Sequence, residues 1–144
     1  MKTVIPLLFL WLLLMQSCGF VYERHLTGNY YLIAVDTKED MDVCYHQQKE
    51  DDAPYIGITG ASVYAVGYDD DFILVKAYRA LRDSMGISSP CYDKNTTEYY
   101  IIPVNNAQEA WEAQENKFGA FSKKAFEVKR KELGVSDDIT FKDL

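Results

Sequence analysis

Two histidines and a nearby cysteine are the side chains best suited to bind a metal ion. His46 lies two residues after Cys44, so in a strand both side chains would share one face. A zinc site needs three or four converging ligands, and the sequence has no Cys-x-x-Cys, His-x-His or His-Glu-x-x-His spacing. His25 is the other histidine, and no motif joins it to this pair. We therefore predict no metal site and interpret His46 as a half-buried strand residue.

Acidic runs and serines offer other chemistry, but none has the spacing of a known site. Asp69–Asp71 and Glu50–Asp52 carry oxygen ligands of the kind that calcium prefers, yet the ligand spacing of an EF-hand is absent. Ser62 and Ser84 lack both a Gly-x-Ser-x-Gly motif and an evident base. No glycine-rich loop indicates a phosphate-bearing cofactor. The sequence predicts no catalytic residue, no cofactor and no enzymatic activity.

The thiol of Cys18 follows a segment with the layout of an export signal. Lys2 gives a positive start, Val4–Met15 is an uncharged apolar run of twelve residues, and Ser17 is a small residue directly before the cysteine. Twelve helical residues span about 18 Å, which is short of the roughly 30 Å hydrocarbon core of a bilayer. We expect residues 1–17 to be a signal peptide rather than a membrane-spanning helix.

The sequence Met15-Gln16-Ser17-Cys18 resembles the lipobox of bacterial lipoproteins, although Met15 and Gln16 differ from the residues usual there. In that family the signal is removed and the cysteine thiol is diacylated. The resemblance implies lipidation at Cys18. Gly19, in place of the aspartate of an inner-membrane retention signal, implies sorting to the outer membrane, facing the periplasm. A plain secretory signal cut nearby and an uncleaved anchor are the alternatives.

Cys44 and Cys91 remain once Cys18 is assigned to lipid. An oxidising envelope would permit a disulfide between them. This disulfide would close a loop of about 47 residues, and in the chain-entropy model it would stabilise the folded state by about 3–4 kcal/mol. Two free thiols are the alternative, because the sequence does not fix the distance between the two Cα atoms. Both outcomes stay open.

The net charge narrows the classes of partner. The whole chain has a formal charge of −7, and the 127 residues from Cys18 onward carry 14 Lys and Arg against 22 Asp and Glu, a charge of −8. So acidic a protein is not expected to bind nucleic acid. It also lacks the polybasic stretch that would attract it to a membrane. We expect the membrane contact to come from the lipid, since two acyl chains give stable anchoring.

Strand-like segments precede helix-like segments, and this order predicts an α+β fold. Ser62–Tyr78 has two β-rich arms around an acidic connector, which predicts a hairpin. Ser122 and Gly134 stand where the second of two helices would begin and end. We predict an antiparallel sheet of about five strands followed by two C-terminal helices packed on one face. These form one domain over 28–144, after a tether over 18–27.

Three segments resemble small bacterial lipoproteins that carry a domain of unknown function: SVYAVGYDDDFILVK, EYYIIPV and FSKKAFEVKRKELGV. The resemblance covers most of residues 28–138. It implies a location in the cell envelope and implies no activity.

Tyrosine is unusually frequent, with eleven residues that include the doublets Tyr30-Tyr31 and Tyr99-Tyr100. In a strand, one ring of each doublet points to each face. Exposed tyrosines on a rigid sheet suit recognition, and ordinary sheet packing is the alternative. We predict a non-catalytic binding or structural module, held to the membrane by lipid, with a protein partner in the envelope. The first alternative is an inhibitor or immunity-type protein that covers a basic envelope enzyme, and a hydrolase is the second.

Overall fold

The computed structural model describes residues 19–47, 53–60, 62–82 and 88–144. The predicted signal peptide, Cys18, Glu50–Asp52 and Ser84 lie outside the described residues. The elements are β1 (Tyr22–Thr27), β2 (Tyr30–Ala34), η1 (Lys38–Asp40), β3 (Asp42–His46), β4 (Tyr55–Gly57), β5 (Val63–Tyr68), β6 (Phe72–Arg82), β7 (Ser88–Pro103), α2 (Ala110–Asn116), β8 (Phe118–Phe121), α3 (Lys123–Glu132) and β9 (Lys142–Asp143).

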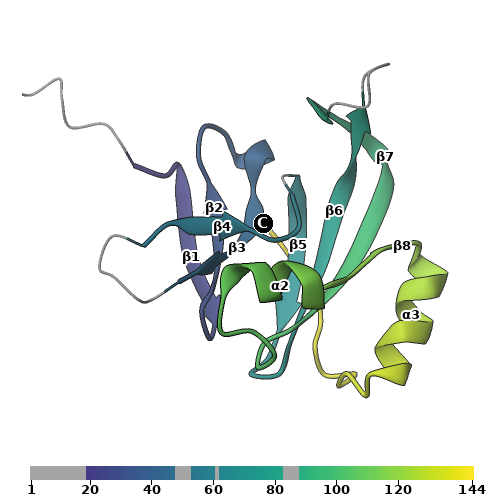
Figure 1. Ribbon diagram of the computed structural model, residues 1–144. Helices are drawn as coiled ribbons and strands as arrows, with labels where there is room; N and C mark the ends of the chain where they lie inside the picture. Colours follow the sequence, from purple (N-terminus) through teal and green to yellow (C-terminus); the bar gives the residue numbers. More distant parts are fainter. Residues whose placement is uncertain (1–18, 48–52, 61, 83–87) are drawn as a thin grey trace, which may run out of the picture.

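The described strands form two antiparallel sheets, seen side by side in Figure 1. The first has the order β1-β2-β3-β4, and the second the order β8-β7-β6-β5-β9. The predicted α+β class is confirmed, but the single sheet of about five strands is matched only by the second sheet. The chain passes between the sheets through Gly60 and Ser62, whose φ angles of 80° and 81° turn the backbone sharply. Strands β4 and β5 on either side of this turn belong to different sheets, and alternation along the sequence does not reveal this division.

The main core lies between the two sheets. Each sheet buries the alternate side chains of one face there, as the twofold periodicity of strands requires. The first sheet contributes Tyr30 and Leu32 from β2, and the second contributes Ile73 and Val75 from β6. Helix α2 adds Ala110 and Ala113 to the same core. Strands from both sheets thus share one interior.

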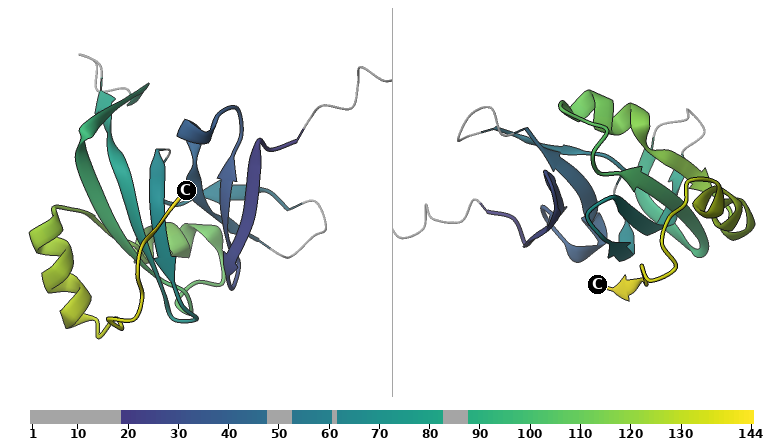
Figure 2. Two further views of the ribbon diagram at one scale, coloured as in Figure 1. Left: turned by 180° about the vertical axis from the view of Figure 1, so that it is seen from behind. Right: turned by 90° about the horizontal axis from the view of Figure 1, so that it is seen from below.

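A second, smaller core lies on the other face of the five-stranded sheet. Leu74 and Ile101 point to that face and pack against Phe126 of α3. The N-terminus of α3 is capped by the Ser122 side chain, which accepts a hydrogen bond from the Ala125 amide. After α3 the chain runs back to β9 beside β5 (Figure 2). The two helices therefore do not share one face, because α2 packs on β3 and β7 while α3 packs on β7 and β8.

Residues 22–27, predicted to belong to the tether, form strand β1 instead. Tyr22 pairs with Ala34 and Thr27 with Tyr30, so β1 lies antiparallel to β2 along its whole length. Leu26 and Thr27 are buried. The polar residues in the middle of β1 mask this strand in the sequence. The folded unit begins several residues before residue 28. In the part of the chain that the structure describes, no helix has the length and apolar character needed to cross a membrane.

Candidate functional site

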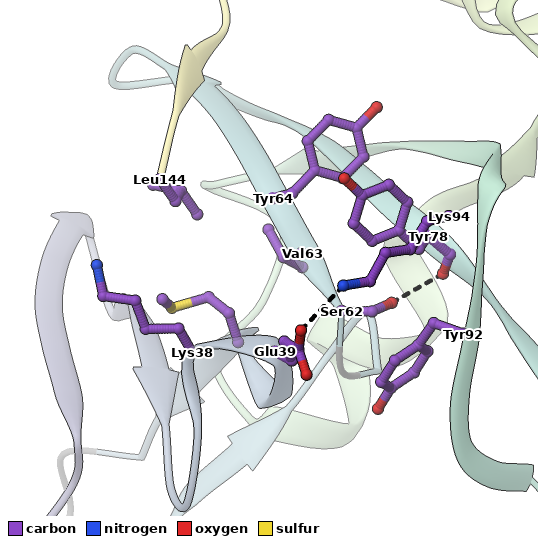
Figure 3. Close-up of a pocket in the computed structure, with 10 residues that line it drawn as sticks. Lys38, Glu39, Ser62, Val63, Tyr64, Tyr78, Tyr92, Lys94 and Leu144 are labelled. Atoms are coloured by element: carbon purple, nitrogen blue, oxygen red, sulfur yellow. Dashed lines mark hydrogen bonds and ion pairs between the residues drawn. The ribbon is translucent and has the colours of Figure 1, made fainter.

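A small pocket of about 110 Å³ lies beside η1 and β5 (Figure 3). Its position follows from two backbone hydrogen bonds. Val63 N donates to Met41 O at 2.9 Å and joins β5 to the first sheet, while Leu144 N donates to Tyr64 O at 3.0 Å. The pocket lining comes from η1, β5, β6, β7 and the residues next to them: Lys38, Glu39, Met41, Ser62, Val63, Tyr64, Tyr78, Tyr92, Lys94 and Leu144.

Two stacked tyrosines form one wall of this pocket. The rings of Tyr64 and Tyr78 lie 4.4 Å apart between centroids, at 19° to each other. The register of β5 against β6 shifts between Val63 and Ala65, which makes Tyr64 the extra residue of a bulge. The Tyr64 hydroxyl lies 2.8 Å from Thr97 Oγ1 on β7, and this contact fixes the ring. The wall is therefore a rigid aromatic surface.

Two polar interactions join residues that line the pocket. Lys94 Nζ lies 2.9 Å from Glu39 Oε1, an exposed ion pair that joins β7 to η1 and raises the pKa of Lys94. Ser62 Oγ donates to Tyr78 O at 2.8 Å, so the serine considered as a nucleophile serves a structural role. Burial, and then the carboxylates of Asp40 and Asp42, raise the pKa of Tyr92. None of these contacts aligns a nucleophile with a base.

A second candidate surface is the outer face of the four-stranded sheet, where both histidines lie. His46 stacks on Tyr55 with ring centroids 4.6 Å apart, and His25 lies 4.8 Å from Tyr31. The Tyr31 ring also contacts the rings of His46 and Tyr55, which completes one cluster. Tyr55 donates its hydroxyl hydrogen to Glu23 at 2.9 Å, and its pKa is raised to about 12, by burial first and by Glu23 next.

Asp42, Cys44 and His46 line one open groove on this face, so the prediction that Cys44 and His46 share a face is confirmed. Burial raises the pKa of the Cys44 thiol to about 12, which keeps it protonated and a poor ligand at neutral pH. Among the described residues, no three His, Cys, Asp or Glu side chains converge in a way that could hold a metal ion.

Both cysteines of the open disulfide question are free in this structure. Cys44 is buried in β3, whereas Cys91 is exposed in β7. Titration of thiols in denatured protein purified without reductant remains the test of the bond. The acidic turn has a structural role as well, because Asp69 Oδ1 accepts hydrogen bonds from the amides of Asp71 and Phe72 at 2.9 and 2.8 Å.

The tyrosine doublets divide as their alternation predicts. Tyr30 is fully buried while Tyr31 is half-buried on the outer face, and Tyr100 is buried while Tyr99 is half-buried against the second core. The pocket tyrosines could not be recognised as a group from the sequence, because Tyr64, Tyr78 and Tyr92 come from three separate strands. The one sequence feature that relates two of them is the predicted hairpin, because Tyr64 and Tyr78 lie in its two arms.

A comparison with known protein families gives a match over most of the chain. A family model described as protein of unknown function (DUF3997) matches residues 27–144. The chain belongs to the DUF3997 family. This membership confirms the domain of unknown function that the resemblance implied, while its lipoprotein character stays a prediction. Comparisons with curated proteins and with solved structures give no match.

Proposed function

We propose that this DUF3997 protein is a non-catalytic binding module, anchored in the cell envelope by lipid on Cys18, that captures a side chain of a protein partner in the pocket beside η1. The observation that carries the proposal is the pocket itself, with its stacked wall of Tyr64 and Tyr78. Rigid tyrosines offer a large contact area at low entropic cost and are frequent among residues that dominate binding energy.

The size of the pocket favours a side chain over a free small molecule. Sites for small molecules usually enclose about 300–1,000 Å³. The pocket measures about 110 Å³, which suits one anchoring side chain. Its walls include the apolar residues Met41, Val63 and Leu144, so we expect that side chain to be apolar. The exposed Lys94–Glu39 pair at the same pocket would contact the polar edge of the partner.

Capture from envelope extract tests the pocket directly. We expect Tyr78→Ala to weaken binding of the partner by about 30-fold, the effect typical of a dominant interface residue. Trp111→Ala is the matched control, since Trp111 is an exposed aromatic residue of α2 that does not line the pocket. Equal capture by Tyr78→Ala and the wild type would show that the pocket is not the binding site.

The same experiment at two salt concentrations separates the alternative function. If the partner is a basic enzyme covered by the acidic surface, high salt should weaken capture strongly and the protein should inhibit that enzyme. If the apolar pocket dominates, capture should change little with salt.

A further inference from the structure

The residues closest to the predicted anchor are already part of the folded domain. Val21 N donates to Ala34 O at 2.9 Å, and the Phe20 ring packs edge-on against Tyr55 with centroids 5.4 Å apart. Cys18 is therefore two residues away from a side chain fixed on the first sheet, and two extended residues span at most about 7 Å. An anchor at Cys18, or in the apolar run before it, would hold this side of the domain close to a membrane.

Exposed apolar side chains gather at this point. Phe20 is 41% exposed, and Val21 and Val35 are each 56% exposed. Val21 lies beside Val35 because its amide bonds to the residue before Val35. These three residues, called here the N-terminal patch, are half of the large apolar side chains that are exposed among the described residues. Exposed apolar patches commonly mark a surface that contacts a partner or a membrane.

An open groove of about 760 Å³ continues the N-terminal patch across the outer face of the four-stranded sheet. Phe20 and Val35 line it together with Ile33, Pro54 and Tyr55. His46 lines the same groove and stacks on Tyr55. Rings with one polar and one apolar end are enriched where a protein meets the boundary between headgroups and acyl chains. The composition of the groove thus fits a bilayer interface.

The charges around the patch indicate an apolar rather than an electrostatic contact. Asp40 and Asp42 line the groove, and Glu23 bonds to Tyr55 at its side. Lys38 is the nearby cation, with its Nζ 5.8 Å from the centre of the Tyr22 ring. Attraction to anionic headgroups requires clusters of Lys and Arg, and these are not present at this surface in the described residues.

We infer that the N-terminal patch and the adjoining groove form the membrane-facing surface of the domain, seated at the interface of a phospholipid bilayer. The inference rests on the anchoring part of the proposed function and leaves the pocket free. Asp40 of η1 lines the groove while Glu39 lines the pocket, so η1 separates the two surfaces. A domain seated in this way would present its pocket at a fixed height above the membrane.

Fluorescence quenching in vesicles measures this orientation on the full chain. A Cys91→Ser parent removes the exposed thiol, and Val35→Cys in that parent carries an NBD label. Val128→Cys is the matched control, because Val128 is 61% exposed on α3. Strand β1 and helix α3 lie at opposite ends of the molecule in both figures that show the whole chain (Figures 1 and 2). The labelled parent without a new cysteine reports any label on Cys18 or Cys44.

After reconstitution into phosphatidylcholine vesicles with a headgroup-attached nitroxide, we expect severalfold stronger quenching at residue 35 than at residue 128, with a blue-shifted emission at residue 35. Val21→Cys should behave like Val35→Cys. Equal quenching at both ends, or stronger quenching at residue 128, would overturn the orientation while leaving the anchor intact. Failure of every sample to float with the vesicles would overturn the anchor as well, whereas the capture experiment with Tyr78→Ala would still test the pocket.

Discussion

At the scale of single residues, Tyr30 and Tyr45 of the main core differ in the hydrogen bonds that their hydroxyl groups make. Tyr45 accepts a hydrogen bond from Asn29 Nδ2 at 3.1 Å and donates to Ala107 O at 3.2 Å. The Tyr30 hydroxyl is buried and has no hydrogen-bond partner among the described residues. The rings of the two tyrosines pack edge-on with centroids 5.2 Å apart, and both residues are fully buried. The pair therefore isolates the effect of an unsatisfied hydroxyl.

We predict that Tyr30→Phe leaves stability unchanged or raises it by up to about 1 kcal/mol, because it removes a buried polar group that has no partner. Tyr45→Phe should destabilise the protein by about 1 kcal/mol, because it leaves two partners unpaired. Urea unfolding at constant m-value measures both. Equal losses in the two variants would mean that the Tyr30 hydroxyl is bonded in solution.

The buried carboxyl group of Asp42 is expected to make the stability of the fold depend on pH. Burial is the largest effect on its carboxyl group and raises the pKa above 3.8, although hydrogen bonds from Thr59 lower it. The folded state therefore holds the proton to a higher pH than the unfolded state. Asp42 costs the fold no stability below pH 4 and costs most above its folded pKa.

Asp42→Asn should remove this cost while its amide oxygen still accepts from Thr59, whose Oγ1 lies 2.7 Å from Asp42 Oδ1. The stability of Asp42→Asn relative to the wild type should therefore rise between pH 4 and pH 7. Chemical unfolding of both proteins across that range measures the difference, in which other titrating groups cancel. A relative stability that falls with pH would show that the ionised carboxylate stabilises the fold.

At the scale of secondary structure, β1 changes what counts as the smallest folding unit. Alternation alone suggests that strands begin at residue 30, but Leu26 is buried in the main core and β1 protects one edge of β2. We predict that a fragment of residues 19–144 unfolds cooperatively and that a fragment of residues 28–144 is strongly destabilised or aggregates. Thermal unfolding followed by circular dichroism compares the two.

A point substitution separates the role of β1 from the effects of truncation. Leu26→Ala should cost about 2–4 kcal/mol, as expected for a buried leucine. Val128→Ala, at an exposed position of α3, should change stability by less than about 0.5 kcal/mol. If Leu26→Ala lowers the free energy of unfolding no more than Val128→Ala does, β1 acts as a tether and does not stabilise the core.

Some of these structural elements could be predicted from the sequence and others could not. The hairpin of β5 and β6 and the helix that begins after Ser122 were predictable, because each depends on neighbours within a few residues. The division into two sheets was not predictable, since it depends on the sharp change of chain direction at Gly60 and Ser62. The pocket was equally hidden, because Lys94 and Glu39 are 55 positions apart in the chain and meet only in the fold.

At the scale of the whole molecule, the five-stranded sheet lies between the two cores, with one core on each of its faces. The first sheet is continuous with the N-terminal segment, while α3 packs on the opposite side of the second sheet. The pocket lies where the two sheets are joined at β5. The proposed anchor, the proposed membrane-facing surface and the proposed binding pocket thus lie at different places on the molecule.

The proposed cellular role depends on the proposed lipid anchor, and Cys18→Ser tests that anchor. The export layout before Cys18 and the resemblance to a lipobox predict a diacylated thiol, which serine cannot provide. Two acyl chains give stable membrane attachment, whereas the acidic domain would give little on its own. We expect the wild type in the detergent-soluble membrane fraction. We expect Cys18→Ser in the soluble fraction or retained as uncleaved precursor, with the acyl mass absent from its N-terminal peptide.

Cys91→Ser is the control for loss of a thiol and should stay with the membrane. A Cys18→Ser protein that fractionates and is processed like the wild type would exclude the lipid anchor.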